Sequence, residues 1–190
     1  MSGAPRDLTM PELVEAHARA LAGVGADAVP IKRAAHLDGV DALILPGGES
    51  TTIAKGLERL DLYEPLEAFG RSGKPVLGTC AGAILLAREV ANHPVRSLGL
   101  IDVVAARNAY GTQVDSFAGP VEEGIWQGMP CVFIRAPRLE KVGDGVEVLA
   151  WLGGAPVAVR QDNVWATTFH PELTDDPRVH RALVDAAALC

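Results

Sequence analysis

The chain has 190 residues, of which 48% are hydrophobic and 22% charged, a composition typical of one well-packed globular domain rather than a disordered segment. Its net charge of −7 argues against a surface that binds nucleic acid or anionic lipid. No apolar run approaches the roughly 20 residues that a membrane-spanning helix needs, and the N-terminus lacks the apolar core of a signal peptide. We therefore expect a cytoplasmic protein with no nucleic-acid or membrane partner.

The first half of the chain alternates helical and strand patterns. A helix with Pro11 in its first turn is expected near the N-terminus, and residues 1–10 offer no strand. Strands are then expected at 27–33 and 40–46, and helices at 51–60 and 64–71. This alternation is typical of a parallel sheet with helices on its faces.

The second half is richer in strands. Strands are expected at 98–106, 113–119, 131–137, 145–152, 155–160 and 163–169, followed by a helix at 176–189. No repeat, low-complexity tract or long linker divides the chain. We therefore expect a single α/β domain over residues 1–190.

A glycine-rich stretch, Gly78-Thr79-Cys80-Ala81-Gly82, interrupts an apolar run. A buried strand is predicted before it and a helix from Ala81 to Val90 after it, so Cys80 falls in the turn between them. Glycines two residues on either side let a strand reverse sharply into a closely packed helix, the geometry of a nucleophile elbow. A helix N-terminus favours the thiolate that a nucleophilic cysteine needs. Taken alone, the motif also fits an inert cysteine in a tight turn.

The other cysteines do not suggest a second site. Cys80, Cys131 and Cys190 are widely spaced and odd in number, with no Cys-x-x-Cys and no Cys/His pair at metal-ligand spacing. The sequence therefore predicts neither a disulfide nor a zinc site, and no other metal or cofactor is expected.

A base for thiol chemistry is available in the stretch ATTFHPEL. Pro171 biases His170 away from helical geometry, so His170 and Glu172 are expected in an extended segment with their side chains on the same side. A carboxylate so placed can accept the imidazole N–H and leave the other ring nitrogen for the thiol. A surface histidine beside a solvated glutamate fits the same three residues. The remaining histidines have no such neighbour and are interpreted as structural or solvated: His17, His36, His93 and His180.

The segment LILPGGESTT places Gly47 and Gly48 after a predicted strand. The carboxyl edge of an open α/β sheet is where such folds bind ligands, and a glycine N–H there could face a developing oxyanion. Ser50, Thr51 and Thr52 could instead serve only to cap the next helix. A phosphate cradle is a further alternative, although the G-x-x-x-x-G-K-[ST] motif is absent.

Five segments together resemble one family. LPGGESTT, GTCAG, RNAYGTQVDSF, FIRAP and FHPELTDDPRVH, in this order and at these distances, are similar to the glutaminase subunits of pyridoxal 5'-phosphate synthase, which are class I (triad) glutamine amidotransferases. The resemblance covers about residues 28–190. It implies a flavodoxin-like α/β domain with a mixed, mostly parallel sheet and helices on both faces.

The same resemblance implies roles for individual residues. Cys80 would be the nucleophile, and His170 and Glu172 would complete a triad. N–H groups of Gly48 and Ala81 would form the oxyanion site. Arg107 and Arg135 could be ordinary surface arginines, but a guanidinium suits the α-carboxylate of glutamine. The residues implied to bind substrate are Gly48, Glu49, Ser50, Arg107, Ile134 and Arg135.

The implied reaction is hydrolysis of L-glutamine to L-glutamate and ammonia. His170 would take the thiol proton as sulfur attacks the amide and would then return it to the leaving ammonia. Ammonia would pass directly to a barrel-shaped synthase subunit, which in the family forms a dodecamer carrying up to twelve glutaminases, and would be used there to make pyridoxal 5'-phosphate.

The N-terminus departs from the family pattern. Family members usually open with an apolar strand ending in Leu-Gln-Gly, whereas residues 1–10 contain no such strand. A position in the sheet is therefore expected to be empty or filled differently, with consequences for activation by the partner. Two alternatives remain: the glutaminase of another triad amidotransferase, such as that of histidine or cobalamin biosynthesis, and a catalytically impaired binding subunit.

Overall fold

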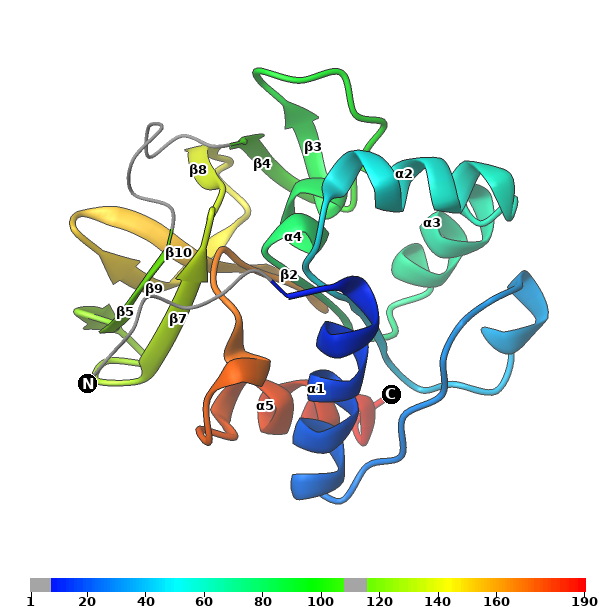
Figure 1. The fold of residues 1–190 in the computed structure, drawn as a ribbon, viewed down its shortest axis with the longest axis horizontal. Coiled ribbons are helices and arrows are strands. Elements are labelled where there is room, and N and C mark those ends of the chain that lie inside the picture. Colours follow the sequence, from blue (N-terminus) through cyan, green and yellow to red (C-terminus); the bar gives the residue numbers. More distant parts are fainter. Residues whose placement is uncertain (1–7, 108–115) are drawn as a thin grey trace.

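The computed structural model describes residues 8–107 and 116–190, which form a mixed α/β fold around a six-stranded sheet (Figure 1). In spatial order the strands are β1 (Leu43–Leu45), β2 (Val76–Thr79), β11 (Val164–Thr167), β10 (Ala155–Gln161), β9 (Glu147–Leu152) and β6 (Glu123–Gly124). A three-stranded sheet contains β3 (Ala87–Val90), β4 (Ile101–Ala106) and β8 (Arg138–Val142). A two-stranded sheet pairs β5 (Ser116–Pro120) with β7 (Pro130–Ile134).

Strand direction divides the six-stranded sheet into two parts. β1 and β2 run parallel, as expected for the first half of the chain, and β11, from the second half, also runs parallel to β2. β10, β9 and β6 join by antiparallel pairs, because short turns rather than crossover helices connect β9, β10 and β11. The sheet is therefore mixed, with two parallel pairings among β1, β2 and β11 and three antiparallel pairings, which are fewer parallel pairings than a mostly parallel sheet would have.

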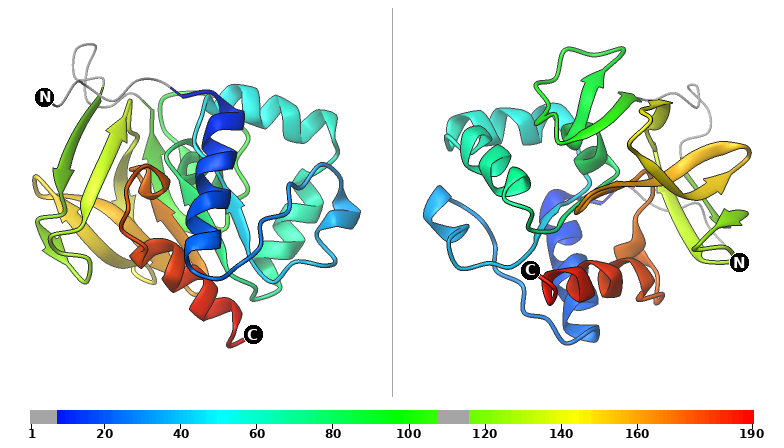
Figure 2. Two further views of the ribbon diagram at one scale, coloured as in Figure 1. Left: turned by 60° about the horizontal axis from the view of Figure 1, so that its bottom comes forward. Right: turned by 180° about the vertical axis from the view of Figure 1, so that it is seen from behind.

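Helices cover both faces of this sheet, as predicted. Figures 1 and 2 show α2 (Ser50–Arg59), α3 (Tyr63–Arg71) and α4 (Ala81–Leu86) on one face, and α1 (Met10–Gly23) and α5 (Arg178–Ala187) on the other. Successive residues of β2 face opposite sides, so Val76 belongs to one hydrophobic cluster and Leu77 to the other. The sheet thus separates two apolar cores.

The strand predicted at 27–33 does not form. Residues 24–33 contain neither helix nor strand, and a short 3-10 helix, η1 (Ala34–His36), follows them. β1 pairs only with β2 among the described residues, so its other edge has no strand partner there. The apolar pattern at 27–33 alone cannot make a strand, because a strand needs a neighbour to satisfy its backbone hydrogen bonds.

The helix predicted from Ala81 to Val90 is shorter than expected. α4 ends at Leu86, and the next four residues form β3, which pairs in parallel with β4. The N–H groups of Leu98 and Leu100 donate to the carbonyls of Leu85 and Leu86, at 2.7 and 2.9 Å, and so compete with helical bonding. Tertiary pairing has replaced the last turns of the expected helix.

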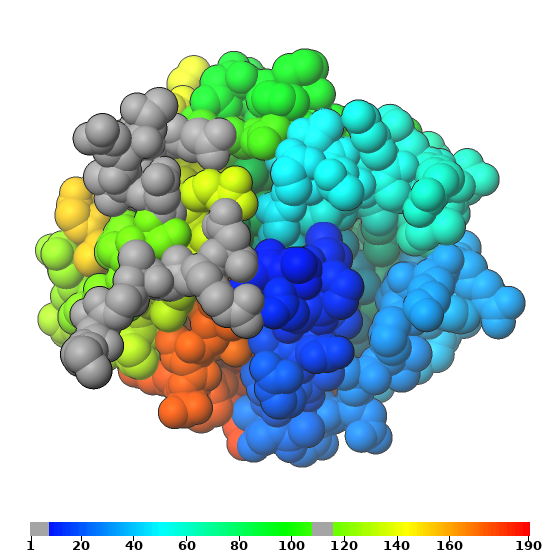
Figure 3. Space-filling model, in the orientation of Figure 1, coloured from blue at the N-terminus to red at the C-terminus, as the bar shows by residue number. Residues whose placement is uncertain are grey.

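The outer surface of α1 is well exposed, whereas its inner face is buried. In the space-filling view α1 (dark blue) lies between α2 (cyan) and the segment around η2 (orange), Pro171–Leu173 (Figure 3). Leu13, Ala16 and His17 form its buried stripe. None of the helices in the two described ranges is long and apolar enough to cross a bilayer.

Candidate active site

Cys80 lies in the tight turn between β2 and α4, as the sequence predicts. Its backbone has φ 51° and ψ −105°, outside the regions that a non-glycine residue normally occupies. The two flanking glycines are required by close approach: a Cβ on Gly78 would lie 2.6 Å from the carbonyl oxygen of Gly82, and a Cβ on Gly82 would lie 1.9 Å from that of Leu45. The turn is therefore a strained elbow that presents one side chain at the end of the strand.

His170 and Glu172 approach each other as predicted, but not within one extended segment. His170 has φ −106° and ψ 88°, whereas Glu172 lies in η2. Proline suits the first helical position, so Pro171 starts this short turn instead of continuing an extended chain. The His170 Nδ1 is 2.7 Å from the Glu172 Oε1, and both side chains are buried.

The charges around His170 favour its protonated form. Burial opposes that form, but the charge and hydrogen bond of Cys80, together with the hydrogen bond and charge of Glu172, outweigh it and raise the pKa of His170 to about 10. Burial likewise opposes ionisation of Glu172, yet its interactions with His17 and His170 keep the pKa of Glu172 below its usual range. The geometry can therefore hold an imidazolium between a sulfur and a carboxylate.

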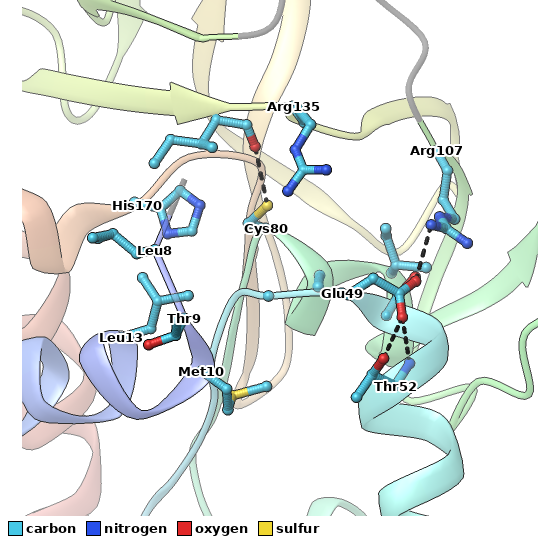
Figure 4. A pocket seen from close by; sticks show the side chains of 15 residues that line it. Leu8, Thr9, Met10, Leu13, Glu49, Thr52, Cys80, Arg107, Arg135 and His170 are labelled. Carbon is cyan, nitrogen blue, oxygen red and sulfur yellow. Dashed lines mark hydrogen bonds and ion pairs between the residues drawn. The ribbon is translucent and has the colours of Figure 1, made fainter. Parts of the chain in front are cut away.

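A cavity of about 270 Å³ opens beside Cys80, where the parallel strands β1 and β2 end (Figure 4). Every residue predicted to bind substrate or stabilise an oxyanion lines it, and Glu172 lies behind His170. The predicted lining residues are Gly48, Glu49, Ser50, Cys80, Ala81, Arg107, Ile134, Arg135 and His170. The cavity is also lined by Leu8, Thr9, Met10, Leu13, Thr52 and Ile84.

Glu49 caps α2, a role that the sequence analysis gave to the hydroxyl residues after it. Its carboxylate accepts hydrogen bonds from the N–H groups of Thr51 and Thr52, at 3.1 and 2.7 Å. The hydrogen bond from the Thr52 hydroxyl is the main cause that lowers the pKa of Glu49 to about 2. Ser50 is buried, and its Oγ has no hydrogen-bond partner among the described residues. A ligand in the cavity could supply that partner.

Two arginines line the cavity on different sides. Arg107 donates to Glu49 Oε1 at 3.2 Å and to Thr51 Oγ1 at 3.1 Å, so its guanidinium is oriented before any ligand binds. Arg135 has φ 44°, directly after Ile134, whose carbonyl oxygen lies 3.7 Å from the Cys80 sulfur. Figure 4 shows the Arg135 and His170 side chains near that sulfur. The guanidinium groups of Arg107 and Arg135 make the cavity suitable for a small ligand with a carboxylate.

The N-terminus of α1 also lines the cavity, which the sequence analysis did not predict. Thr9 and Glu12 form a capping box that fixes the start of this helix. Met10 then lies against the glycine turn, where a Cβ on Gly48 would be 3.0 Å from the methionine Cε. The pattern Thr-x-x-Glu marks the helix start in the sequence, but no local signal shows which part of the sheet the helix reaches.

The chain matches one protein family along nearly its whole length. The SNO glutamine amidotransferase family matches residues 8–188. A protein of Frankia alni named pyridoxal 5'-phosphate synthase subunit PdxT is 54% identical over 176 residues, which are 90% of this chain and 88% of the relative. The protein of the same name from Shouchella clausii is 46% identical over 182 residues, covering 95% and 93%.

Solved structures show the same fold. A crystal structure described as a glutamine amidotransferase superimposes with a TM-score of 0.86 at 45% identity, over 92% of this chain and 93% of that one. A chain in the structure of PurLQS from Thermotoga maritima shares the fold at 17% identity, with a TM-score of 0.65 over 90% and 91% of the two chains. With 54% identity to one relative and a family match from residue 8 to residue 188, the chain belongs to the SNO glutamine amidotransferase family.

Proposed function

We propose that this protein is a glutaminase that hydrolyses L-glutamine to L-glutamate and ammonia through Cys80, His170 and Glu172. The observation that carries the proposal is the position of Cys80 in a strained elbow, at the edge of a cavity, beside a histidine whose Nδ1 lies 2.7 Å from a buried carboxylate. Such an arrangement serves nucleophilic attack on a carbonyl carbon.

The raised pKa of His170 indicates how the reaction begins. With the proton on His170, the sulfur of Cys80 attacks the side-chain amide carbon of glutamine and forms a C–S bond. The oxyanion accepts hydrogen bonds from the N–H groups of Ala81 and Gly48, and one such donor is worth roughly 3 kcal/mol. The C–N bond then breaks, and His170 gives its proton to the leaving ammonia.

Water completes the cycle. His170, now neutral, removes a proton from a water molecule that attacks the thioester, and the C–S bond breaks to release glutamate. Glu172 keeps the imidazole in one orientation throughout. Arg107 or Arg135 holds the α-carboxylate of glutamine. Glu49 and Ser50 contact the rest of the substrate.

The ammonia is used by a partner. The relatives from Frankia alni and Shouchella clausii are named as subunits of pyridoxal 5'-phosphate synthase. We propose that this chain likewise delivers ammonia to a barrel-shaped synthase subunit in the cytoplasm, in an assembly of up to twelve glutaminases on a dodecamer. Direct transfer would prevent the loss of ammonia to solvent.

Ammonia release from glutamine, measured with and without the synthase subunit, tests the proposal. The wild-type protein should release ammonia, Cys80→Ala should not, and the exposed Cys190→Ala variant should match the wild type. A glutamine-analogue electrophile should label Cys80 alone. Activity that survives in Cys80→Ala would exclude this mechanism, and a wild-type protein that binds the synthase but stays inactive would be an impaired binding subunit.

A further inference from the structure

Behind the cavity, four buried polar side chains from four elements meet. They are His17 of α1, Thr79 of β2, Glu172 of η2 and His180 of α5, and none is more than 7% exposed. His17 is central: its Nδ1 lies 2.9 Å from the His180 Nε2, and its Nε2 lies 3.2 Å from the Thr79 Oγ1 and 3.4 Å from the Glu172 Oε2. Figure 2 shows α1 and α5, which supply the two histidines, side by side.

Glu172 faces a different histidine with each oxygen. Oε1 accepts the Nδ1–H of His170 at 2.7 Å. Oε2 is buried and receives no hydrogen bond of good geometry from the described residues, and the Nε2 of His17 at 3.4 Å is the nitrogen that faces it. A buried carboxylate oxygen without a donor is costly, and a small rotation of either side chain would turn this contact into a hydrogen bond.

The surroundings select one tautomer of His17. If Nε2 carries the proton, its hydrogen lies between the Thr79 Oγ1 at 3.2 Å and the Glu172 Oε2 at 3.4 Å, and Nδ1 accepts a hydrogen bond from the Nε2–H of His180. If Nδ1 carried the proton, the lone pair of Nε2 could accept the Thr79 hydroxyl but would also face the negatively charged Glu172, and the buried Nδ1 of His180, which has no partner in the described residues, would have to carry a hydrogen. In the first tautomer only the lone pair on His180 Nδ1 is left unpaired. In the second, a lone pair faces a carboxylate and a buried N–H of His180 is unpaired. The first tautomer is therefore favoured.

Both histidines are held neutral. Burial lowers the pKa of His17, the charge of Glu172 partly offsets it, and the charge of His170 lowers the pKa further. Burial and the neighbouring His17 lower the pKa of His180 to about 4. A neutral His17 donates an N–H without placing a second positive charge beside His170.

We propose that His17 is a positioning residue for the triad: its Nε2–H holds the second oxygen of Glu172 while His170 occupies the first, and His180 fixes the tautomer of His17. This inference rests on the proposed triad. A carboxylate held at both oxygens cannot rotate, so the imidazole that it orients keeps its direction toward Cys80. α1 and α5 thereby support the nucleophile from the face of the sheet opposite α4.

The test uses two substitutions at one position, measured in the complex with the synthase subunit. His17→Met removes both ring nitrogens at similar volume, whereas His17→Gln retains an N–H donor near the place of Nε2. We expect His17→Met to lower kcat roughly ten- to a hundredfold, by analogy with residues that orient metal ligands from behind, with KM nearly unchanged. His17→Gln should recover most of the loss.

A double-mutant cycle shows whether His17 acts through Glu172. In a Glu172→Gln background, His17→Met should change kcat by less than about twofold, because the carboxylate that it positions is already gone. Val24→Ala is the matched control, since Val24 is a buried residue at the end of α1 that does not line the cavity. It should lower the melting temperature and leave kcat per labelled Cys80 unchanged.

A measurement on the wild-type protein tests the proposal even if the variants fail to fold. Nitrogen-15 NMR of histidine-labelled wild-type protein should show His17 neutral, with the hydrogen on Nε2 and none on Nδ1. The reverse tautomer, or equal loss of kcat from His17→Met in both backgrounds, would overturn the proposal. A wild-type protein without glutaminase activity would instead refute the proposed function, and the tautomer would still be measurable.

Discussion

Cys80 has a backbone conformation that its own side chain disfavours. A non-glycine residue at φ 51° and ψ −105° costs roughly 1–3 kcal/mol, which the surrounding structure must offset. The N–H of Cys80 donates to the carbonyl of Thr167 at 2.8 Å, and the glycines at 78 and 82 allow β2, α4 and β1 to approach closely. The strain is thus held by β1, β2, β11 and α4 at once, so the direction of the sulfur is fixed before substrate binds.

Two glycine-to-alanine substitutions distinguish the effect of close packing on stability from the effect of backbone entropy. In Gly82→Ala the new Cβ would lie 1.9 Å from the Leu45 carbonyl oxygen, so we expect a loss of stability of roughly 1–3 kcal/mol or more. In Gly56→Ala, inside α2, the Cβ meets nothing within 4 Å, and stability should rise by about 0.5–1 kcal/mol. Urea denaturation measures both, and equal changes would show that Gly82 is not tightly packed.

The two partners of Cys80 should differ in their effects. His170→Asn removes the group that carries the proton, so we expect glutamine hydrolysis to be abolished. Glu172→Gln removes only the carboxylate that orients the imidazole, so activity should fall but stay measurable. Steady-state ammonia release and the rate of Cys80 labelling by an electrophile measure both effects. Small, equal losses from the two variants would point to a different base.

At the level of single residues, the sequence was informative where chemistry is local. The glycines that shape the Cys80 turn, Gly78 and Gly82, lie two positions from it. His170 likewise lies two positions from Glu172, the residue that it contacts. His17 was interpreted as structural or solvated, yet it is buried and reaches the carboxylate of Glu172. Its spacing from Leu13 and Ala16 on one helical face predicts burial, but only the packing of α1 shows the partner.

β1 is the element whose surroundings differ most from the prediction. Its three residues pair with β2 on one edge, and the opposite edge has no strand partner in the described ranges. An unpaired edge leaves backbone N–H and C=O groups without ladder bonds. The segment 27–33, expected to be a strand, contains neither helix nor strand and therefore adds no ladder to β1.

Supplying a strand at this edge should stabilise the protein. We would replace residues 1–7 with an apolar strand and a Gln-Gly turn leading into the cap of α1 at Thr9. The melting temperature and the synthase-stimulated release of ammonia should both rise, because new ladder bonds would satisfy the edge of β1. A Gly/Ser-rich replacement of equal length is the control. No change in either quantity would mean that the open edge has no cost.

The ends of some helices and strands cannot be predicted from the local sequence. α1, α2, α3 and α5 follow their apolar periodicity and agree with the expected helices. α4 is cut at Leu86 by pairing with a distant strand, and β8 has no apolar alternation in its sequence, so that only Leu139 of its five residues is buried. Both outcomes depend on β4, which lies between β3 and β8. Pairing of this kind depends on residues far away in the sequence.

For the whole molecule, the buried histidines predict how stability depends on pH. The pKa of His180 falls from 6.5 to about 4 on folding, and that of His17 also falls. The unfolded chain therefore binds more protons between these values, and stability should decrease as pH falls from 6.5 toward 4, by at most about 1.4 kcal/mol per pH unit for each histidine. His170 has the opposite sign: its pKa rises to about 10, so its contribution is complete below pH 6.5 and is lost as pH rises toward 10.

Melting temperature measured from pH 4 to pH 10 should therefore have a maximum near neutrality. His180→Leu removes one of the groups that must charge in acid, so it should flatten the acid side of the curve. Val24→Ala, which removes no titratable group, is the control and should leave the slope unchanged. An acid slope identical in His180→Leu and wild type would show that His180 does not titrate on unfolding.

The contact between His17 and His180 joins residues that are 163 positions apart. During synthesis on the ribosome, α1 leaves the exit tunnel long before α5 is made. Cys80 is therefore already present while His17 still lacks its partner, His180. Contacts of such long sequence separation form late, because the intervening chain must be ordered first. A nascent chain therefore carries Cys80, the proposed nucleophile, for some time before His180 can complete the cluster behind it.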